Sequence, residues 1–538
     1  MNLIEPIELT IEDSNEPGLR IPQSLWTLLN AARDGNLAVV DRILTARPDV
    51  VDMQFWYTSP LQLAVRGGHL NVVKYLVDKD ADIANQLTLH GEESLLQMAE
   101  DREYDDIVSY LRPLFREVLN SEGDSVSIHQ ACEEGDIDKV RQELDADPEL
   151  LERGDSVGRK PLHYAVQAQN YELVDLLLDR RANINATGFS SDNRLGGFGF
   201  TPLALSLWWH QYWRQRNNYE MAKKLVERGA IYNITIAAAL GDTDTVKLML
   251  ADDPGLANFH DSCGKRPLSA ASERNHLDIV KMLLDAGALP NLPDGPMAPH
   301  GYALWATARF GFKEVAQLLL ENGADPNADV ESSGNPTESA KDLEMRSLLY
   351  TYGGRQRLSS HFHQGNTDTI AALLYFNPEL FDELVATVAF THCASSHHED
   401  LLKLMLHAGL RVPHTVTYCQ SYFWHHLDMA RILLEHDMDP DLPNWQCVRP
   451  LHYMGQKGQI DAAKLFLEFG ATPNLIDDEY RTTPLGWAAK HGQTEFVSFW
   501  LERFPDSKTE RPEDMPDWAT PLAWAKKRNH PEIVEMLS

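Results

Sequence analysis

The chain has few cysteines and few basic residues for its length, and it contains no long apolar run. Only five of its 538 residues are cysteine, and no two of them form a C-x-x-C pair. An odd, thinly spread set of thiols suggests neither a disulfide framework nor a zinc–thiolate site. We therefore expect no metal and no cofactor. Basic residues number 48 against 80 acidic ones, which gives a formal net charge of −32.

The shortage of lysine and arginine argues against direct nucleic-acid binding, because phosphate backbones are bound by clustered cations. The charge permits a basic protein partner, although a high net charge also simply keeps a protein in solution. No stretch approaches 18 apolar residues, and residues 1–20 do not read as a signal peptide. We therefore expect a soluble, intracellular protein in the cytoplasm that does not associate with membranes.

A repeated pattern dominates what is present. A short helix, a Gly or Asn turn and a second helix with Val or Ile before Leu-Leu recur about every 33 residues, in about sixteen copies. Several copies begin with a Pro-Leu motif, as in residues 160–165, 201–203, 449–453, 483–485 and 520–525. Thr before Pro suits a helix start, because Thr caps the first turn and Pro needs no N–H there.

This period and these motifs resemble the ankyrin-repeat family over about residues 25–538. The resemblance implies an all-α solenoid of stacked helix–turn–helix pairs with short finger turns between them. It also implies a protein that binds other proteins. The motif histidines His163 and His452 resemble structural hydrogen-bonding residues, not catalytic bases.

Breaks in the period divide the chain. The steps from Ala222 to Val246 and from Arg346 to Ile370 are only 24 residues long, which predicts two seams. We expect an acidic extension or cap over 1–24, a first block over 25–230 with a loop and helix insertion at 187–216, a second block over 231–354, and a third over 355–538 that is His-rich in its first half.

The insertion contains the first candidate binding site. Residues 207–216 are expected to form an aromatic helix, and Trp, Tyr and Arg dominate binding hot spots. Two interpretations stay open: these side chains pack on the 187–200 loop as a local core, or they form a platform for a partner. The partner-binding candidates are Phe198, Phe200, Trp208, Trp209, Tyr212, Trp213, Arg214 and Arg216.

The second candidate is acidic. Residues 127–155 carry ten acidic residues against three Lys and Arg. Glu133, Glu134, Asp136 and Asp138 are candidates for docking a basic partner, and a solvated helix face is the alternative. The acid pair Asp477 and Asp478 is predicted to lie in solvent on a turn.

Histidine is concentrated in residues 361–452, which hold eleven of the 21. Their spacing follows no zinc motif, so we expect structural or solvated side chains, with a pH-sensitive surface as the alternative. No catalytic motif occurs, and we expect no enzyme and no catalytic residue. The predicted function is a binding scaffold or adaptor that recognises a protein through its concave face and finger tips. The alternative is an acidic inhibitor or decoy that occupies a basic site of another protein, including a nucleic-acid-binding one.

Overall fold

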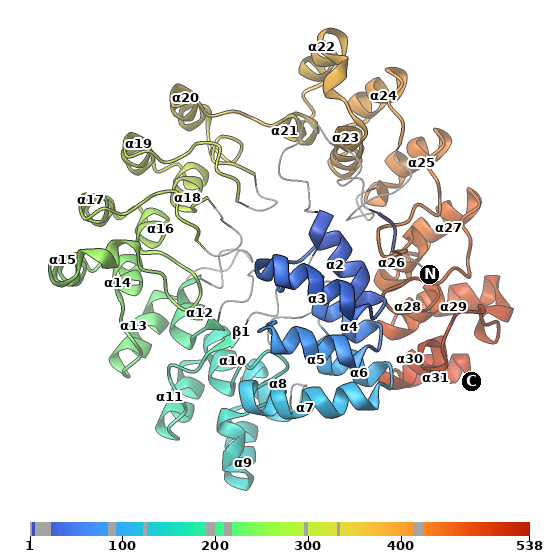
Figure 1. Cartoon of the computed structure of the whole chain (residues 1–538), viewed down its shortest axis with the longest axis horizontal. Helices are drawn as coiled ribbons and strands as arrows, with labels where there is room; N and C mark the ends of the chain where they lie inside the picture. The colour runs from blue at the N-terminus through green and yellow to red at the C-terminus, as the bar shows by residue number, and fades with distance from the viewer. Residues whose placement is uncertain are drawn as a thin grey trace. The chain divides into compact units, whose positions relative to one another are not determined.

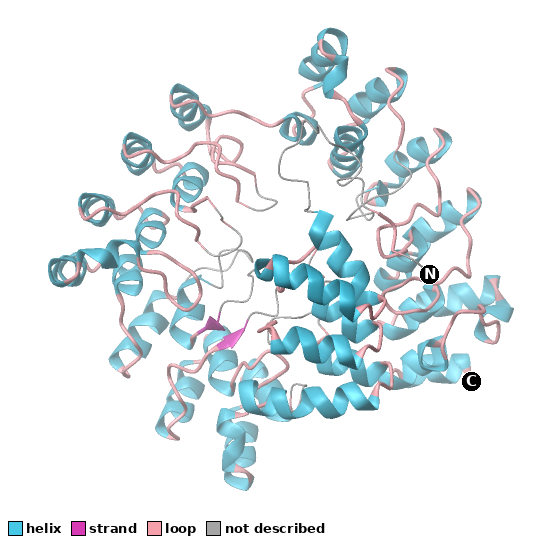
Figure 2. Ribbon diagram, viewed as in Figure 1, coloured by secondary structure: helices cyan, strands magenta, loops and turns pink. Residues whose placement is uncertain are grey.

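The computed structural model describes residues 3–5, 23–56, 58–83, 93–121, 126–189, 199–208, 218–294, 298, 300–330, 334–412 and 423–538. In these residues the chain is almost entirely helical, and short helices follow one another in pairs along the sequence (Figures 1 and 2). The predicted all-α architecture of repeated helix–turn–helix units is confirmed.

The chain forms two compact units. The first contains residues 1–75, 99–104 and 357–538, and the second contains residues 76–98 and 105–356. Segments from both ends of the sequence therefore belong to the same unit. The division into three blocks stays a prediction.

The first unit holds the helices nearest both ends of the sequence, of which α5 and α6 continue into the second unit. Its helices are α2 (Gln23–Arg33), α3 (Leu37–Ala46), η1 (Pro48–Val50), α4 (Pro60–Arg66), α5 (Leu70–Asp78), α6 (Leu95–Asp101), α21 (Leu358–His363), α22 (Thr367–Phe376), η7 (Pro378–Leu380), α23 (Glu383–Ser395), α24 (Glu399–His407), α25 (Leu427–Glu435), α26 (Pro450–Lys457), α27 (Ile460–Glu468), α28 (Pro484–Lys490), α29 (Thr494–Arg503), η9 (Pro505–Lys508), η10 (Asp517–Ala519), α30 (Pro521–Lys527) and α31 (Pro531–Leu537).

The second unit holds the middle of the sequence. Its elements are α7 (Asp105–Leu119), α8 (Ser127–Glu134), α9 (Ile137–Ala146), η2 (Pro148–Glu152), α10 (Pro161–Gln167), α11 (Tyr171–Asp179), β1 (Gly188–Phe189), β2 (Gly199–Phe200), α12 (Pro202–Trp208), α13 (Tyr219–Glu227), α14 (Ile234–Leu240), α15 (Thr243–Asp252), η5 (Pro254–Asn258), α16 (Pro267–Ser272), α17 (Leu277–Asp285), α18 (Ala303–Phe310), α19 (Lys313–Glu321) and α20 (Leu343–Thr351).

The helix ends follow from local sequence. Thr483 caps α28 by accepting a hydrogen bond from the N–H of Gly486, and Pro484 is the first helical residue. Gly229 follows α13 with a φ of 97°, a conformation that suits glycine. Asn233 then caps α14 directly, so no finger fits between these two helices, as the short step there predicts.

Each unit has its own apolar core, supplied by residues from successive repeats. In the second unit one continuous cluster runs from Ile128 to Leu349. In the first unit a cluster runs from Phe362 to Leu537, and a smaller one joins Leu3 and helices α2 and α4 to Trp445. Stacking is needed because a single short helix pair cannot bury its own apolar stripe.

The motif histidines are structural, as the resemblance implies. His163 Nδ1 accepts a hydrogen bond from the backbone N–H of Lys160 at 2.9 Å, and Nε2 donates to the carbonyl of Phe200 at 3.0 Å. His452 makes the same type of bonds to Arg449 and Leu475. Burial lowers the pKa of both imidazoles to about 4, so both are neutral at pH 7.

Candidate binding surfaces

Most of the aromatic candidate site lies outside the described residues. This applies to Phe198, Trp209, Tyr212, Trp213, Arg214 and Arg216. Trp208 is the last residue of α12. Phe200 is buried and lies in strand β2, where it pairs with Gly188 of β1 in an antiparallel ladder. The aromatic platform stays a prediction.

The acidic candidates are described and exposed. Glu133 and Glu134 end helix α8, and Asp136 and Asp138 lie at the start of α9. Asp136 caps α9 by accepting from the N–H of Lys139, and Asp138 pairs with Arg141 at 3.1 Å. Such exposed pairs contribute little free energy. The acidic docking site stays a prediction.

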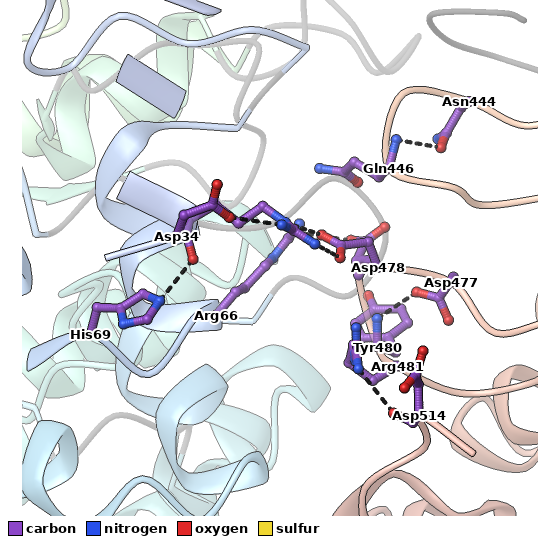
Figure 3. Close-up of polar contacts among 12 residues, drawn as sticks. Asp34, Arg66, His69, Asn444, Gln446, Asp477, Asp478, Tyr480, Arg481 and Asp514 are labelled. Carbon is purple, nitrogen blue, oxygen red and sulfur yellow. Dashed lines mark hydrogen bonds and ion pairs between the residues drawn. The ribbon is translucent and has the colours of Figure 1, made fainter. Parts of the chain in front are cut away.

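The two ends of the chain make a contact that the sequence did not predict, and we call it the terminal junction. It joins α2, α4 and the end of α6 to residues 442–449, residues 476–482 and helix α30, all within the first unit. Figure 3 shows its centre, with Asp34 and Arg66 on one side and Asp478 and Tyr480 on the facing turn.

Three arginines from the N-terminal repeats make the polar part of the junction. Arg33 binds Asp478 with two hydrogen bonds, Nε to Oδ2 at 3.1 Å and Nη2 to Oδ1 at 2.5 Å. Arg66 Nη2 lies 3.3 Å from Oε1 of Glu479, and Arg102 Nη2 donates to the Glu479 carbonyl at 2.6 Å. Burial lowers the pKa of Arg33, but the carboxylates of Asp478 and of Asp34, which accepts from Arg33 Nη1 at 2.9 Å, outweigh it and raise that pKa above the usual value.

An aromatic cluster makes the apolar part. The Trp445 ring lies 6.1 Å from that of Trp26 and 5.2 Å from that of Phe55, both in edge-on geometry. The N–H of Ile4 donates to the carbonyl of Trp445 at 2.9 Å. Edge-on aromatic pairs add about 0.5–1.5 kcal/mol beyond their burial, so this cluster anchors the contact.

A second ion pair fixes the other side of the junction. Asp101, at the end of α6, accepts hydrogen bonds from both terminal nitrogens of Arg528, and its carbonyl accepts one from Lys527. The guanidinium of Arg102 lies over the Trp518 ring at 5.3 Å. Helix α6 therefore contacts the last repeat of the sequence.

The junction corrects one expectation. The pair Asp477 and Asp478 is not solvated, because the exposed fractions are 0% and 8%; the next residue, Glu479, is also buried, at 2%. Asp477 accepts hydrogen bonds from backbone N–H groups of its own turn, and the other two meet arginines. The sequence did carry a signal, because Arg33, Arg66 and Arg102 recur at nearly the repeat spacing.

The histidine-rich segment forms a partly exposed surface on α21 to α25. The rings of His397 and His426 stack at 4.5 Å, and His397 lies 2.6 Å from a carboxylate oxygen of Asp428. His363 and His392 make an edge-on pair at 5.5 Å. His414 lies outside the described residues. Among the residues that the structure describes, no His, Cys, Asp and Glu side chains gather in a group suited to a metal ion.

Comparison with known families identifies the repeat. The family described as "Ankyrin repeats (3 copies)" matches residues 28–120, 128–236, 234–330 and 451–538, which is more than half of the chain. The chain therefore belongs to the ankyrin-repeat family. Proteins of this family typically mediate protein–protein interactions, and the repeat itself is usually non-catalytic.

Individual relatives are distant. The probable 26S proteasome regulatory subunit p28 of Saccharomyces cerevisiae is 25% identical over 29% of this chain and 83% of its own length. Human transient receptor potential cation channel subfamily A member 1 is 21% identical over 77% of this chain and 39% of its own. Rat ankyrin repeat and SAM domain-containing protein 6 is 30% identical over 47% of this chain and 28% of its own. The chain thus spans well under half of the last two relatives.

Among solved structures, the ankyrin repeat domain of human ASB11 aligns with 43% of this chain and all of its own, at 20% identity and a TM-score of 0.26. Within the described ranges, each helix is too short or too polar to cross a bilayer. The cytoplasmic location stays a prediction.

Proposed function

We propose that the chain is a non-catalytic adaptor that binds a protein partner through its finger turns and inner helices. Family membership supports protein binding in general. The exposed carboxylates on α8 and α9 support a basic partner in particular. They belong to residues 127–155, which include ten acidic residues, in a chain of net charge −32. The field of such a patch draws cations toward it.

The geometry favours recognition over local pairing. Asp138 remains 94% exposed in its side chain although it pairs with Arg141. Glu133 and Glu134 are the last two residues of α8, the helix before α9. Carboxylates at the carboxyl end of a helix are disfavoured by the helix dipole. A basic partner would relieve this repulsion, so the patch gains more from a cationic ligand than from its own neighbours.

Affinity purification with charge-reversed chains tests this proposal. We expect Glu133→Lys/Glu134→Lys to lose the partners that the wild-type chain retains. The matched control is Glu513→Lys/Asp514→Lys, which reverses an exposed acid pair elsewhere. Trp209→Ala/Trp213→Ala tests the aromatic candidates separately. Identical partners for the α8 variant and the wild type would refute the acidic site.

The alternative function, an acidic inhibitor that occupies a basic site of another protein, is favoured by the same exposed carboxylates. It predicts that affinity for a purified partner falls steeply between low and high salt, because exposed charges are screened within about 10 Å at 0.1 M salt. An affinity that does not change with salt would exclude it.

A further inference from the structure

The first three repeats carry arginine at nearly the same position. Arg33 is the last residue of α2, Arg66 is the last residue of α4, and Arg102 directly follows α6. The spacings are 33 and 36 residues, close to one repeat. The three cations therefore recur at the ends of α2, α4 and α6, and all three are buried or largely buried. We call them the arginine row.

All three arginines bind one short stretch of chain. Asp478 and Glu479 are consecutive residues of the turn between α27 and α28, and they receive every polar contact described above from the row. The turn is thus bound as a ligand would be, by side chains that project from a separate set of repeats. Bidentate pairing of arginine with carboxylate is the strongest form of such recognition.

The row is not fully satisfied by this occupant. The side chain of Arg66 is only 5% exposed, and its ion pair with Glu479 is long at 3.3 Å. Among the residues that the structure describes, Nε and Nη1 of Arg66 have no hydrogen-bond partner. A buried donor left unmade costs about 1–3 kcal/mol, and more when it is charged. A carboxylate placed squarely on Arg66 would recover this free energy.

We propose that Arg33, Arg66 and Arg102 form a binding site for an acidic segment of a protein partner, and that the chain's own residues 476–482 occupy this site as a displaceable internal ligand. The proposal rests on the protein-binding function proposed above, but it concerns a different surface and a ligand of opposite charge. A partner with adjacent carboxylates would compete with the internal turn and open the terminal junction.

The internal ligand sets how strongly a competitor must bind. A tethered segment acts at an effective concentration of about millimolar, so a single external acidic peptide displaces it poorly from the wild-type chain. Removing the charge of the internal turn without changing its shape should expose the site to an external acid.

A peptide-binding assay on the full chain tests this inference. The probe is a fluorescent peptide with the sequence of residues 474–482, and its control carries Asn and Gln in place of its three acids. We expect the probe to bind Asp478→Asn/Glu479→Gln at least tenfold more tightly than the wild type, and the control peptide to bind neither. Adding Arg66→Gln to this variant should weaken probe binding at least tenfold.

The matched control is Glu399→Gln/Asp400→Asn, which makes the same change in charge on an exposed pair of α24. It should bind the probe no better than the wild type. Where Asp478→Asn/Glu479→Gln fails to fold, hydrogen exchange of the wild-type chain decides the matter. Millimolar probe should then accelerate exchange of the amides of residues 476–482.

Three results would overturn the inference. The first is a folded Asp478→Asn/Glu479→Gln variant that does not bind the probe. If this variant does not fold, the corresponding result is that the probe leaves the hydrogen exchange of residues 476–482 in the wild type unchanged. The second is probe binding to the double variant that does not weaken when Arg66→Gln is added. The third is a wild-type dimer in light scattering that Arg66→Gln dissociates, since a second copy would then be the occupant. None of these measurements involves Glu133 or Glu134, so the adaptor proposal can fail or survive independently.

Discussion

Asp477 is a buried acidic residue of the terminal junction. Its replacement by alanine should lower the free energy of local opening around the 476–482 turn. Its carboxylate is fully buried. It accepts hydrogen bonds from the N–H of Tyr480 at 2.5 Å, the N–H of Thr482 at 3.2 Å and Nε1 of Trp487 at 2.9 Å. Asp477→Ala leaves these three donors without their acceptor.

The magnitude follows from the number of donors. Each buried donor that loses its acceptor costs about 1–3 kcal/mol, so we expect a loss of at least about 3 kcal/mol in the local free energy of opening. Asp477→Asn keeps one acceptor oxygen and should lose about half as much. A repeat protein opens locally, so the loss concentrates on the turn and on helices α26 and α28.

Hydrogen–deuterium exchange read by mass spectrometry measures this loss. A decrease of about 3 kcal/mol corresponds to exchange about a hundredfold faster, and it should be confined to peptides that cover α26, the 476–482 turn and α28. Asp506→Ala, at an exposed acid of η9, is the control and should change exchange little. Exchange in Asp477→Ala within threefold of the wild type would refute the reasoning from buried donors.

Three further perturbations test the repeats. Burial lowers the pKa of His163 and of His452 to about 4 in the folded chain. As the pH falls below about 6.5, the unfolded chain therefore binds protons that the folded chain does not. Each of these two histidines should lower the free energy of unfolding by about 2 kcal/mol between pH 7 and pH 5. In urea unfolding, the stability of His163→Gln should therefore depend less on pH than that of the wild type. Thr520 caps α30, because its Oγ1 accepts a hydrogen bond from the N–H of Ala523 at 3.2 Å. Thr520→Ala removes this bond. It should cost about 1 kcal/mol, seen as faster exchange of α30, with Thr520→Ser close to the wild type. Phe362→Ala empties a fully buried site and should cost about 3–5 kcal/mol in urea unfolding followed by circular dichroism; a change below 1 kcal/mol would mean that the first unit repacks there.

The ion pairs of the terminal junction matter more for which repeats meet than for total stability. Removing two charges from water costs free energy, and a well-formed buried ion pair does little more than offset that cost. Arg33 with Asp478, and Arg528 with Asp101, are both largely buried and both bidentate. Their geometry matches only one alignment of the two ends, whereas the aromatic contacts of Trp445 would tolerate several.

The repeat and its local details could be predicted from the amino-acid sequence alone. Helix caps, the left-handed turn at Gly229 and the roles of His163 and His452 all depend on residues that lie within about one repeat of each other. A pattern that recurs about every 33 residues reports these features many times. The missing finger before α14 could be predicted for the same reason.

The contact between the two ends of the chain could not be predicted in this way. Arg33 and Asp478 are 445 residues apart, and no local pattern encodes a pairing at that distance. The acids of the 476–482 turn look like ordinary turn residues in the sequence, and their burial follows from what packs against them. The arginine row was visible in the sequence, but its meaning depended on the opposing carboxylates, because charges identify their partner only once the fold has placed the two side by side.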